Sequence, residues 1–277
     1  MKITISSNGD ARIGDLGKSK KLGNLLVAVP DKIQSGSGLH LELELPNFHC
    51  NIGGENPTQG QLACLMCPRS RSDFVAEMDR IDQICDLLAN YVGQIDQLHI
   101  AGLAEPFWKD RIGEVISRLH IENHPAIKVG TTTNALLLDS AACDRWFSSV
   151  QRSEVRFSID AGTPDTYLKI RRIPEFELAV GNMNRFCRKR DSDRHTAILS
   201  NNINLLNLSE LHQMVEMAKN NFCHYLSLVP TSPTDPSLLN ICLNRDNQQQ
   251  FMEAAQSTRE FAGQIGVEVV FGATWPR

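Results

Sequence analysis

Apolar and polar residues follow two alternating patterns along the chain from residue 39 onward. Short apolar runs typical of β-strands are separated by longer stretches whose apolar residues recur three or four positions apart, as in amphipathic helices. The predicted strands are residues 39–45, 95–101, 126–132, 154–160, 195–200, 224–229 and 267–271. The predicted helices are residues 73–92, 110–121, 140–150, 175–190, 209–221 and 247–263.

The spacing of the predicted strands indicates the fold class. After the first unit, strand starts recur about every 30 to 40 residues, which is the length of a βα unit in a parallel sheet. Such crossovers are right-handed almost without exception. We therefore predict an α/β fold, a partial (β/α)6 barrel of parallel strands with a short N-terminal β-hairpin that turns at Asn8-Gly9 or Gly9-Asp10. Residues 1–38 would form the hairpin and a linker, and residues 39–277 the barrel.

Two local patterns give more specific expectations. Glu42 and Glu44 alternate with leucines in the first barrel strand, which favours an exposed edge strand over one that lines a polar interior. Ser209, followed by Glu210 and Gln213, resembles a helix N-terminus.

Composition and charge narrow the class of protein. With 42% hydrophobic and 22% charged residues among 277, the chain can form a packed core. The net charge of −4 gives no electrostatic reason to expect nucleic acid as a partner. No apolar run approaches the roughly 20 residues that span a bilayer, and the N-terminus lacks the apolar centre of a signal peptide. We therefore expect a cytoplasmic protein, in which clustered cysteines are metal ligands or catalytic groups more often than disulfides.

Three of the eight cysteines form a group, Cys50, Cys64 and Cys67, with the spacing C-x13-C-x2-C. The two in the C-x2-C pair can reach one metal centre from a single turn, and a loop rich in glycine and polar residues can bring the third back. Three thiolates suit zinc, with His49 as a fourth ligand, or a [4Fe–4S] cluster that keeps one iron open. Alternatively, the three cysteines are small buried apolar residues without a chemical role. The other five cysteines are scattered, so we expect no second cluster.

The two cysteine segments resemble the cluster motif of the radical S-adenosylmethionine (SAM) superfamily, commonly Cys-x3-Cys-x2-Cys. Cys50-Asn51-Ile52 matches the start of that motif, and Cys64-Leu65-Met66-Cys67-Pro68 matches its end. The difference is the first spacing, which has 13 residues here in place of 3. Long first spacings also occur in some members of the superfamily.

Later strand ends resemble the same superfamily, in the same order along the chain. They read Gly102-Leu103-Ala104-Glu105-Pro106, then Thr132-Thr133-Asn134, then Ser158-Ile159-Asp160 followed by Tyr167 to Arg171, and then Asn201-Asn202. By this resemblance, Glu105 would receive the amino group of the SAM methionine and Arg171 its carboxylate. The full set implied to bind SAM is Gly102, Glu105, Asn134, Ser158, Asp160, Arg171 and Asn202.

The resemblance, which covers roughly residues 39–270, also implies an activity. It implies an enzyme of the branch that modifies peptides or small molecules, in which a [4Fe–4S] cluster cleaves SAM reductively. The 5′-deoxyadenosyl radical so formed would take hydrogen from a peptide or small-metabolite substrate that the sequence does not identify. A one-electron donor such as flavodoxin or ferredoxin and sensitivity to oxygen are implied as well. The alternatives are a zinc-binding Cys3His module and a barrel enzyme of another chemistry.

Overall fold

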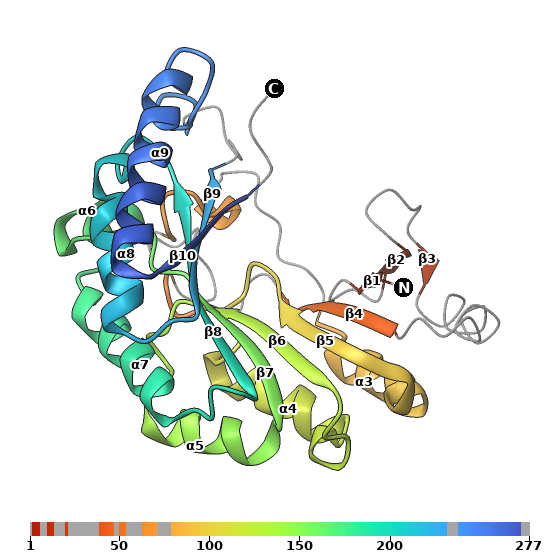
Figure 1. The fold of residues 1–277 in the computed structure, drawn as a ribbon. Helices are drawn as coiled ribbons and strands as arrows, with labels where there is room; N and C mark the ends of the chain where they lie inside the picture. Colours follow the sequence, from red (N-terminus) through yellow and green to blue (C-terminus); the bar gives the residue numbers. More distant parts are fainter. Residues whose placement is uncertain are drawn as a thin grey trace.

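The computed structural model describes residues 2–5, 10–13, 20–21, 39–46, 50–53, 63–70, 79–231 and 238–272. Its strands form one curved ten-stranded sheet in the order β10-β9-β8-β7-β6-β5-β4-β1-β2-β3 (Figure 1). From β4 to β10, each strand pairs in parallel with the next one along the chain. The strands are β1 (Lys2–Ile5), β2 (Asp10–Ile13), β3 (Lys20–Lys21), β4 (Leu39–Glu44), β5 (Ile95–Ala101), β6 (Lys128–Thr133), β7 (Arg152–Phe157), β8 (His195–Ile203), β9 (Tyr225–Pro230) and β10 (Glu268–Phe271).

Helices cover the convex face of this sheet (Figure 1). The α-helices are α3 (Ile81–Leu88), α4 (Arg111–Arg118), α5 (Ser140–Ser149), α6 (Pro164–Arg171), α7 (Phe176–Lys189), α8 (Leu211–Asn220) and α9 (Gln248–Ile265). Short 3-10 helices are η2 (Pro68–Ser70), η3 (Ala89–Gln94), η4 (Trp108–Asp110), η5 (Ile121–Asn123) and η6 (Leu208–Glu210). The predicted α/β partial barrel with an N-terminal hairpin is therefore confirmed. Among these described helices, none is long and apolar enough to cross a membrane.

The core lies between the sheet and its helices. Strand residues that face the helices, such as Leu41, Leu98 and Val155, are at most 2% exposed and belong to one buried apolar cluster. Side chains on the concave face are mostly polar, as at Glu42 and Arg156. Because strand side chains alternate between faces, each strand contributes to both environments. The carboxyl ends of the strands then present polar residues beside a rigid apolar scaffold.

The prediction that Glu42 and Glu44 mark an exposed edge strand is wrong. β4 pairs in parallel with β1 on one side and with β5 on the other, so it lies inside the sheet. Both glutamates are half-buried and point to the concave face, opposite the leucines. The alternation in β4 therefore reflects a sheet with one apolar and one polar face. β1, the first strand of the predicted hairpin, pairs with β2 in antiparallel fashion, and its turn lies outside the described residues.

Helix boundaries differ from the predictions where local capping decides them. α8 begins at Leu211 and follows the 3-10 turn η6, so Ser209 is not its cap. The predicted helix 73–92 is helical from Ile81, and residues 71–78 lie outside the described part. The eight-residue α6 was not predicted, although Thr163 caps it and Pro164 occupies its first turn, a typical start signal.

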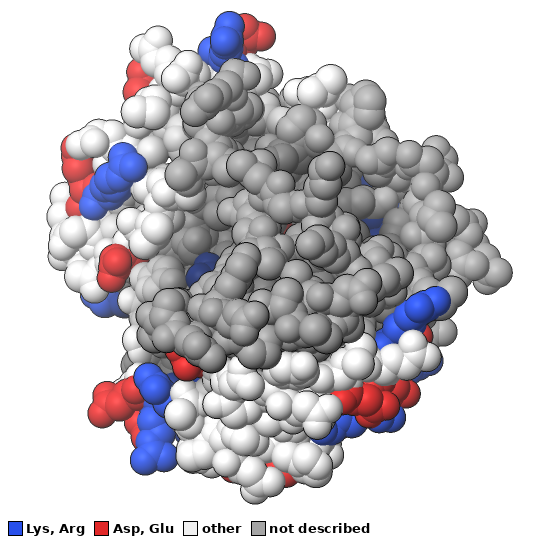
Figure 2. Space-filling model, turned by 90° about the vertical axis from the view of Figure 1, so that its right-hand side faces the viewer, with Lys and Arg blue, Asp and Glu red and all other residues white. Residues whose placement is uncertain are grey.

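Charged side chains of both signs are mixed on the described part of the surface in Figure 2. They lie around the rim of this view rather than gathering by sign. This arrangement agrees with the small net charge of −4 and gives the described rim no basic patch of the kind that nucleic acids bind.

Candidate functional site

A cavity of about 220 Å³ lies at the carboxyl ends of β4 to β8. All ten residues predicted as site residues line it: Cys50, Cys64, Cys67, Gly102, Glu105, Asn134, Ser158, Asp160, Arg171 and Asn202. Its lining also includes Ile52, Met66 and Thr133. A larger hollow of about 510 Å³ lies between α8 and α9, and no predicted site residue lines it. Parallel α/β sheets form their sites at the carboxyl ends of strands, so the smaller cavity is the better candidate.

The two cysteine segments meet although 13 residues separate Cys50 from Cys64. Gly53 has a positive φ of +80°, and a Cβ built on it would lie 2.8 Å from the Cα of Ala63. The backbone after Cys50 therefore touches the backbone before Cys64. The ends of the long spacing come together, and Cys50 faces the same cavity as the Cys64–Cys67 pair.

We expect Gly53→Ala to push these two segments apart. A side chain at this φ is strained, and its Cβ would overlap the backbone of Ala63, so we expect a stability loss of about 2–3 kcal/mol. Chemical denaturation measures this loss, and iron analysis of the reconstituted protein reports on the cysteine group. Gly181→Ala, in open space on α7, is the matched control and should not lower stability. Equal stability of the two variants would contradict the close contact.

Hydrogen bonds fix both cysteine segments to the barrel. The Leu65 amide donates to the Ile170 carbonyl at 2.8 Å, which joins the second segment to α6. The first segment is held by Asn134, whose Nδ2 donates to Asn51 Oδ1 at 2.8 Å. Arg69, only 1% exposed, links the two segments by donating from Nη1 to the Ile52 carbonyl at 3.1 Å. The cysteines are therefore positioned by β6, α6 and one another.

The donor set of this group is three cysteine sulfurs at one cavity, which a [4Fe–4S] cluster can use. Among the described residues, no three His, Cys, Asp or Glu side chains are arranged to surround one metal ion. His49, the fourth ligand of the zinc hypothesis, lies outside that described part. In a [4Fe–4S] cluster each thiolate binds a different iron atom, so three sulfurs need only line one cavity. Burial raises the pKa of Cys50 to about 12 and also raises the pKa of Cys67, so these sulfurs favour the protonated form until a metal stabilises the thiolates.

Glu105 is a buried carboxylate at the wall of the cavity, 2% exposed. It accepts hydrogen bonds from Thr133 Oγ1 at 2.7 Å, from the Asn134 amide at 2.8 Å and from the Phe107 amide at 3.3 Å. Burial raises the pKa of Glu105, and these bonds oppose that rise. A carboxylate offers about four acceptor positions, so one remains for a ligand. Thr133 orients this carboxylate and was not among the predicted site residues.

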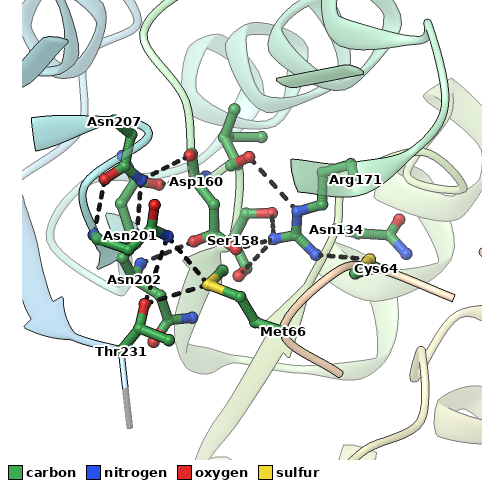
Figure 3. Close-up of polar contacts among 12 residues, drawn as sticks. Cys64, Met66, Asn134, Ser158, Asp160, Arg171, Asn201, Asn202, Asn207 and Thr231 are labelled. Carbon is green, nitrogen blue, oxygen red and sulfur yellow. Dashed lines mark hydrogen bonds and ion pairs between the residues drawn. The ribbon is translucent and has the colours of Figure 1, made fainter. Parts of the chain in front are cut away.

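Arg171 and Asp160 form a buried ion pair at the centre of the site (Figure 3). The guanidinium Nη2 lies 2.8 Å from Asp160 Oδ2 and also donates to the Ser158 hydroxyl at 2.7 Å. Its Nη1 donates to Cys64 Sγ at 3.5 Å. Burial lowers the pKa of Arg171, but Asp160, Cys64 and Tyr167 together outweigh burial and the pKa is raised, so the side chain stays charged. One side chain thus connects the cysteine group to the end of β7.

The asparagines within β8 and just after it, Asn201, Asn202 and Asn207, divide into two groups. Asn201 Oδ1 accepts from the Asp160 amide at 2.8 Å, and Asn207 Nδ2 donates to the Asp160 carbonyl at 2.9 Å (Figure 3). These bonds hold Asp160 at a φ of +63°, which is unusual for a residue with a side chain. Asn202 lines the cavity, and its amide donates to Asp160 Oδ1 at 2.7 Å. Of these three asparagines, Asn202 alone lines the cavity and could contact a ligand there.

Glu210 connects the start of α6 to the start of α8. Its carboxylate accepts from the Gly162 amide at 2.8 Å, from Thr163 Oγ1 at 2.7 Å and from Thr166 Oγ1 at 2.5 Å. A carboxylate at a helix N-terminus also interacts favourably with the helix dipole. Because α6 carries Arg171 at its far end, Glu210 helps to fix the orientation of that arginine.

We expect Glu210→Ala to lower the free energy of unfolding by about 2–4 kcal/mol, because three hydrogen bonds to a charged acceptor are lost. Urea denaturation measures this loss. Glu216→Ala, which removes an exposed glutamate from α8, is the matched control and should change stability little. The role given to Glu210 is wrong if both variants are equally stable.

Among known proteins, solved structures share the fold of this chain. No protein-family model and no curated protein matches the chain. The structure of Streptococcus suis SuiB bound to S-adenosylmethionine aligns with a TM-score of 0.59 and 14% identity, over 93% of this chain and 57% of SuiB. A radical SAM methyltransferase from Sphaerobacter thermophilus aligns with a TM-score of 0.53 and 15% identity, over 76% of this chain and 62% of that enzyme. The fold is that of the radical SAM enzymes.

A third radical SAM structure extends the comparison to peptide complexes. Native anSMEcpe with bound AdoMet and Cp18Cys peptide aligns with a TM-score of 0.62 and 12% identity, over 85% of this chain and 63% of anSMEcpe. The chain thus spans less than two thirds of the length of each of these radical SAM proteins. The resemblance inferred from the cysteine motif and strand ends is confirmed at the level of fold.

Proposed function

We propose that this chain is a radical SAM enzyme that acts on a peptide or a small metabolite. The supporting observation is the convergence of the three motif cysteines and the seven predicted SAM-binding residues on one cavity of a radical SAM fold. If only one of the ten predicted residues lined the cavity, the support for the proposal would be weak. Ten that come from two cysteine segments, four strands or strand ends and one helix end are difficult to explain by chance.

Cys50, Cys64 and Cys67 would hold the [4Fe–4S] cluster in this proposal. The contact between Gly53 and Ala63 brings the first thiol to the other two. When bound, the cluster and SAM would together supply one-electron cleavage to methionine and a 5′-deoxyadenosyl radical that takes hydrogen from the substrate. The remaining work belongs to the chain, which binds and orients the reactants and excludes water.

Glu105 and Arg171 would hold the two ends of the methionine group. An ammonium needs acceptors, and Glu105 keeps one acceptor position beyond its three protein donors. A carboxylate suits the planar fork of Arg171, whose position is fixed by Asp160 and Ser158. Gly102, Asn134 and Asn202 would contact the rest of the cofactor, with Ser158 and Asp160 near its ribose or the substrate.

The proposed partners rest on comparison and on the chemistry. SuiB has been solved bound to its precursor peptide SuiA and anSMEcpe with a peptide, which supports a peptide as one candidate substrate class here. Reductive cleavage needs an electron, so we propose flavodoxin or ferredoxin as donor and a cytoplasmic, oxygen-sensitive enzyme. The reaction outcome depends on the substrate.

Anaerobic reconstitution tests the proposal directly. We expect the purified chain to take up iron and sulfide, to absorb visible light in a broad band that bleaches on reduction, and to form 5′-deoxyadenosine from SAM and dithionite. Chromatography with mass detection measures that product. A colourless protein that holds zinc in equal amount and makes no 5′-deoxyadenosine would instead support the zinc-binding module.

A further inference from the structure

A second hollow lies on the concave face of the sheet, closer to the amino ends of the strands than the candidate site is. Its volume is about 340 Å³, and it is lined by His40, Leu41, Glu42, Gln97, His99, Glu154 and Arg156. Arg156 and Ser158, which lines the first cavity, lie two residues apart along the same strand direction and so about 7 Å apart on one face. The two linings therefore come within about the length of one amino acid of each other.

Arg156 is held in a fixed orientation at one wall of this hollow. Its Nε and Nη2 donate to Glu154 Oε1 at 3.1 and 2.7 Å, and Lys128 Nζ donates to Glu154 Oε2 at 2.8 Å. Burial would raise the pKa of Glu154, but Lys128 and Arg156 outweigh it and the pKa is lowered. Two cations therefore share the Glu154 carboxylate, so these three side chains together carry one positive charge. Glu42, elsewhere in the lining, adds one negative charge to the hollow.

Part of the Arg156 guanidinium remains available for a further acceptor. Arginine has five N–H donors. Among the described residues, Glu154 takes two, and a hydrogen bond with Tyr225 takes a third. Two donors are left on a side chain that its neighbours already hold in place, which lowers the entropic cost of binding a ligand.

His99 forms the neighbouring part of the hollow, and Gly130 makes room for it. His99 pairs in register with Gly130 on β6, and a Cβ built on this glycine would lie 2.3 Å from His99 Nδ1. The imidazole thus lies over β6 at a point where any side chain would displace it. β7 is the next strand, so His99 and Arg156 approach the same space from both sides of β6.

A contribution to fold stability does not explain well why Lys128, Glu154 and Arg156 carry charges on the concave face. Half-buried ion pairs contribute about 0–1 kcal/mol each. Parallel strands covered on both faces are normally apolar on both. A concave face that carries a fixed guanidinium and an imidazole around a hollow is instead suited to a polar ligand.

We propose that this hollow binds a carboxylate group of the substrate, with Arg156 as its main partner and His99 as the second. This inference rests on the proposed function, since it assigns the hollow to the substrate of that enzyme. Glu42 lies beside His99 in register and disfavours a second negative charge at that wall. The substrate class is therefore a molecule or peptide residue with one carboxylate in this hollow, and its reacting part extends toward the first cavity.

Binding of simple carboxylates tests the assignment without knowledge of the natural substrate. The probes are N-acetylated amino acids with a free carboxylate and the corresponding amides, titrated by NMR against the anaerobically reconstituted full chain. We expect the acids to bind and the amides to bind weakly or not at all. Arg156→Gln should weaken acid binding about tenfold or more, since a charge-assisted hydrogen bond is lost. Arg152→Gln, an exposed arginine earlier on β7, is the matched control and should bind like the original chain.

The outcomes separate this proposal from the proposed function. Equal binding of acids and amides, no binding of any acid, or acid binding unchanged by Arg156→Gln would overturn the subsite. If Arg156→Gln fails to fold, Arg156→Lys replaces it, and unchanged acid affinity in that variant has the same meaning. Formation of 5′-deoxyadenosine by the unaltered chain is measured in parallel. A chain that makes this product but does not distinguish acids from amides contradicts the subsite alone.

Discussion

Replacement of Cys64 by alanine should abolish both the iron–sulfur cluster and the formation of 5′-deoxyadenosine. Cys64 begins the second segment of the motif, and Arg171 Nη1 donates to its sulfur at 3.5 Å. Two thiolates at Cys50 and Cys67 would leave two irons of the cluster without a protein ligand, so we expect loss of product to background. Iron and sulfide content, visible absorption and product formation are measured on one anaerobic preparation.

Cys85→Ala is the matched control for this experiment. Cys85 is 1% exposed on α3 and lines no part of the cavity, and burial raises its pKa to about 12, so it stays a thiol. We expect a stability loss of about 1 kcal/mol from the small void and full retention of the cluster. If Cys64→Ala keeps its iron and still makes 5′-deoxyadenosine, the ligand assignment is wrong.

The position of each site residue along the chain could be predicted because parallel strands bring their carboxyl ends to one edge. Glu105 follows β5, Asn134 follows β6 and Ser158 follows β7, so the order of the strands alone places these side chains near one another. The hydrophobic pattern gives that order directly. Their arrival at a single cavity is the structural consequence.

Other features depend on backbone geometry that no sequence pattern encodes. The contact of Gly53 with Ala63 needs a positive φ and a close approach of two segments, and a spacing of 13 residues alone predicts neither. The pairing of β1 beside β4 joins strands far apart in the chain, and the misreading of Glu42 as an edge residue follows from it.

The different roles of two adjacent asparagines in β8 also could not be predicted from the sequence. Asn201 and Asn202 are neighbours of the same residue type, yet one supports Asp160 and the other lines the cavity. Which of them turns outward depends on the alternation of β8 at that point, where Asn201 is 1% exposed and Asn202 is exposed. A shift of one residue in the strand register would exchange their roles.

Replacement of Arg171 by alanine should destabilise the fold by about 3–5 kcal/mol, because it leaves the buried carboxylate of Asp160 without its ion-pair partner. Arg171 also donates to the Ile159 carbonyl at 3.4 Å and to the Ser158 hydroxyl, so the end of β7 loses several contacts together. Urea denaturation measures the loss. Lys169→Ala, an exposed cation on the same helix, should change stability by less than about 0.5 kcal/mol.

The double variant Asp160→Asn/Arg171→Ala distinguishes an unpaired charge from lost packing. Asparagine keeps an oxygen that can accept from the Asn202 amide, and it carries no charge that needs a cation. If the unpaired carboxylate causes most of the loss, the double variant should be more stable than Arg171→Ala alone, with a coupling of about 1–3 kcal/mol. Strict additivity of the two single changes would show that the guanidinium acts mainly by filling space and bonding to backbone carbonyls. Asn201 and Asn207 would then hold Asp160 at its φ of +63° without a contribution from the ion pair.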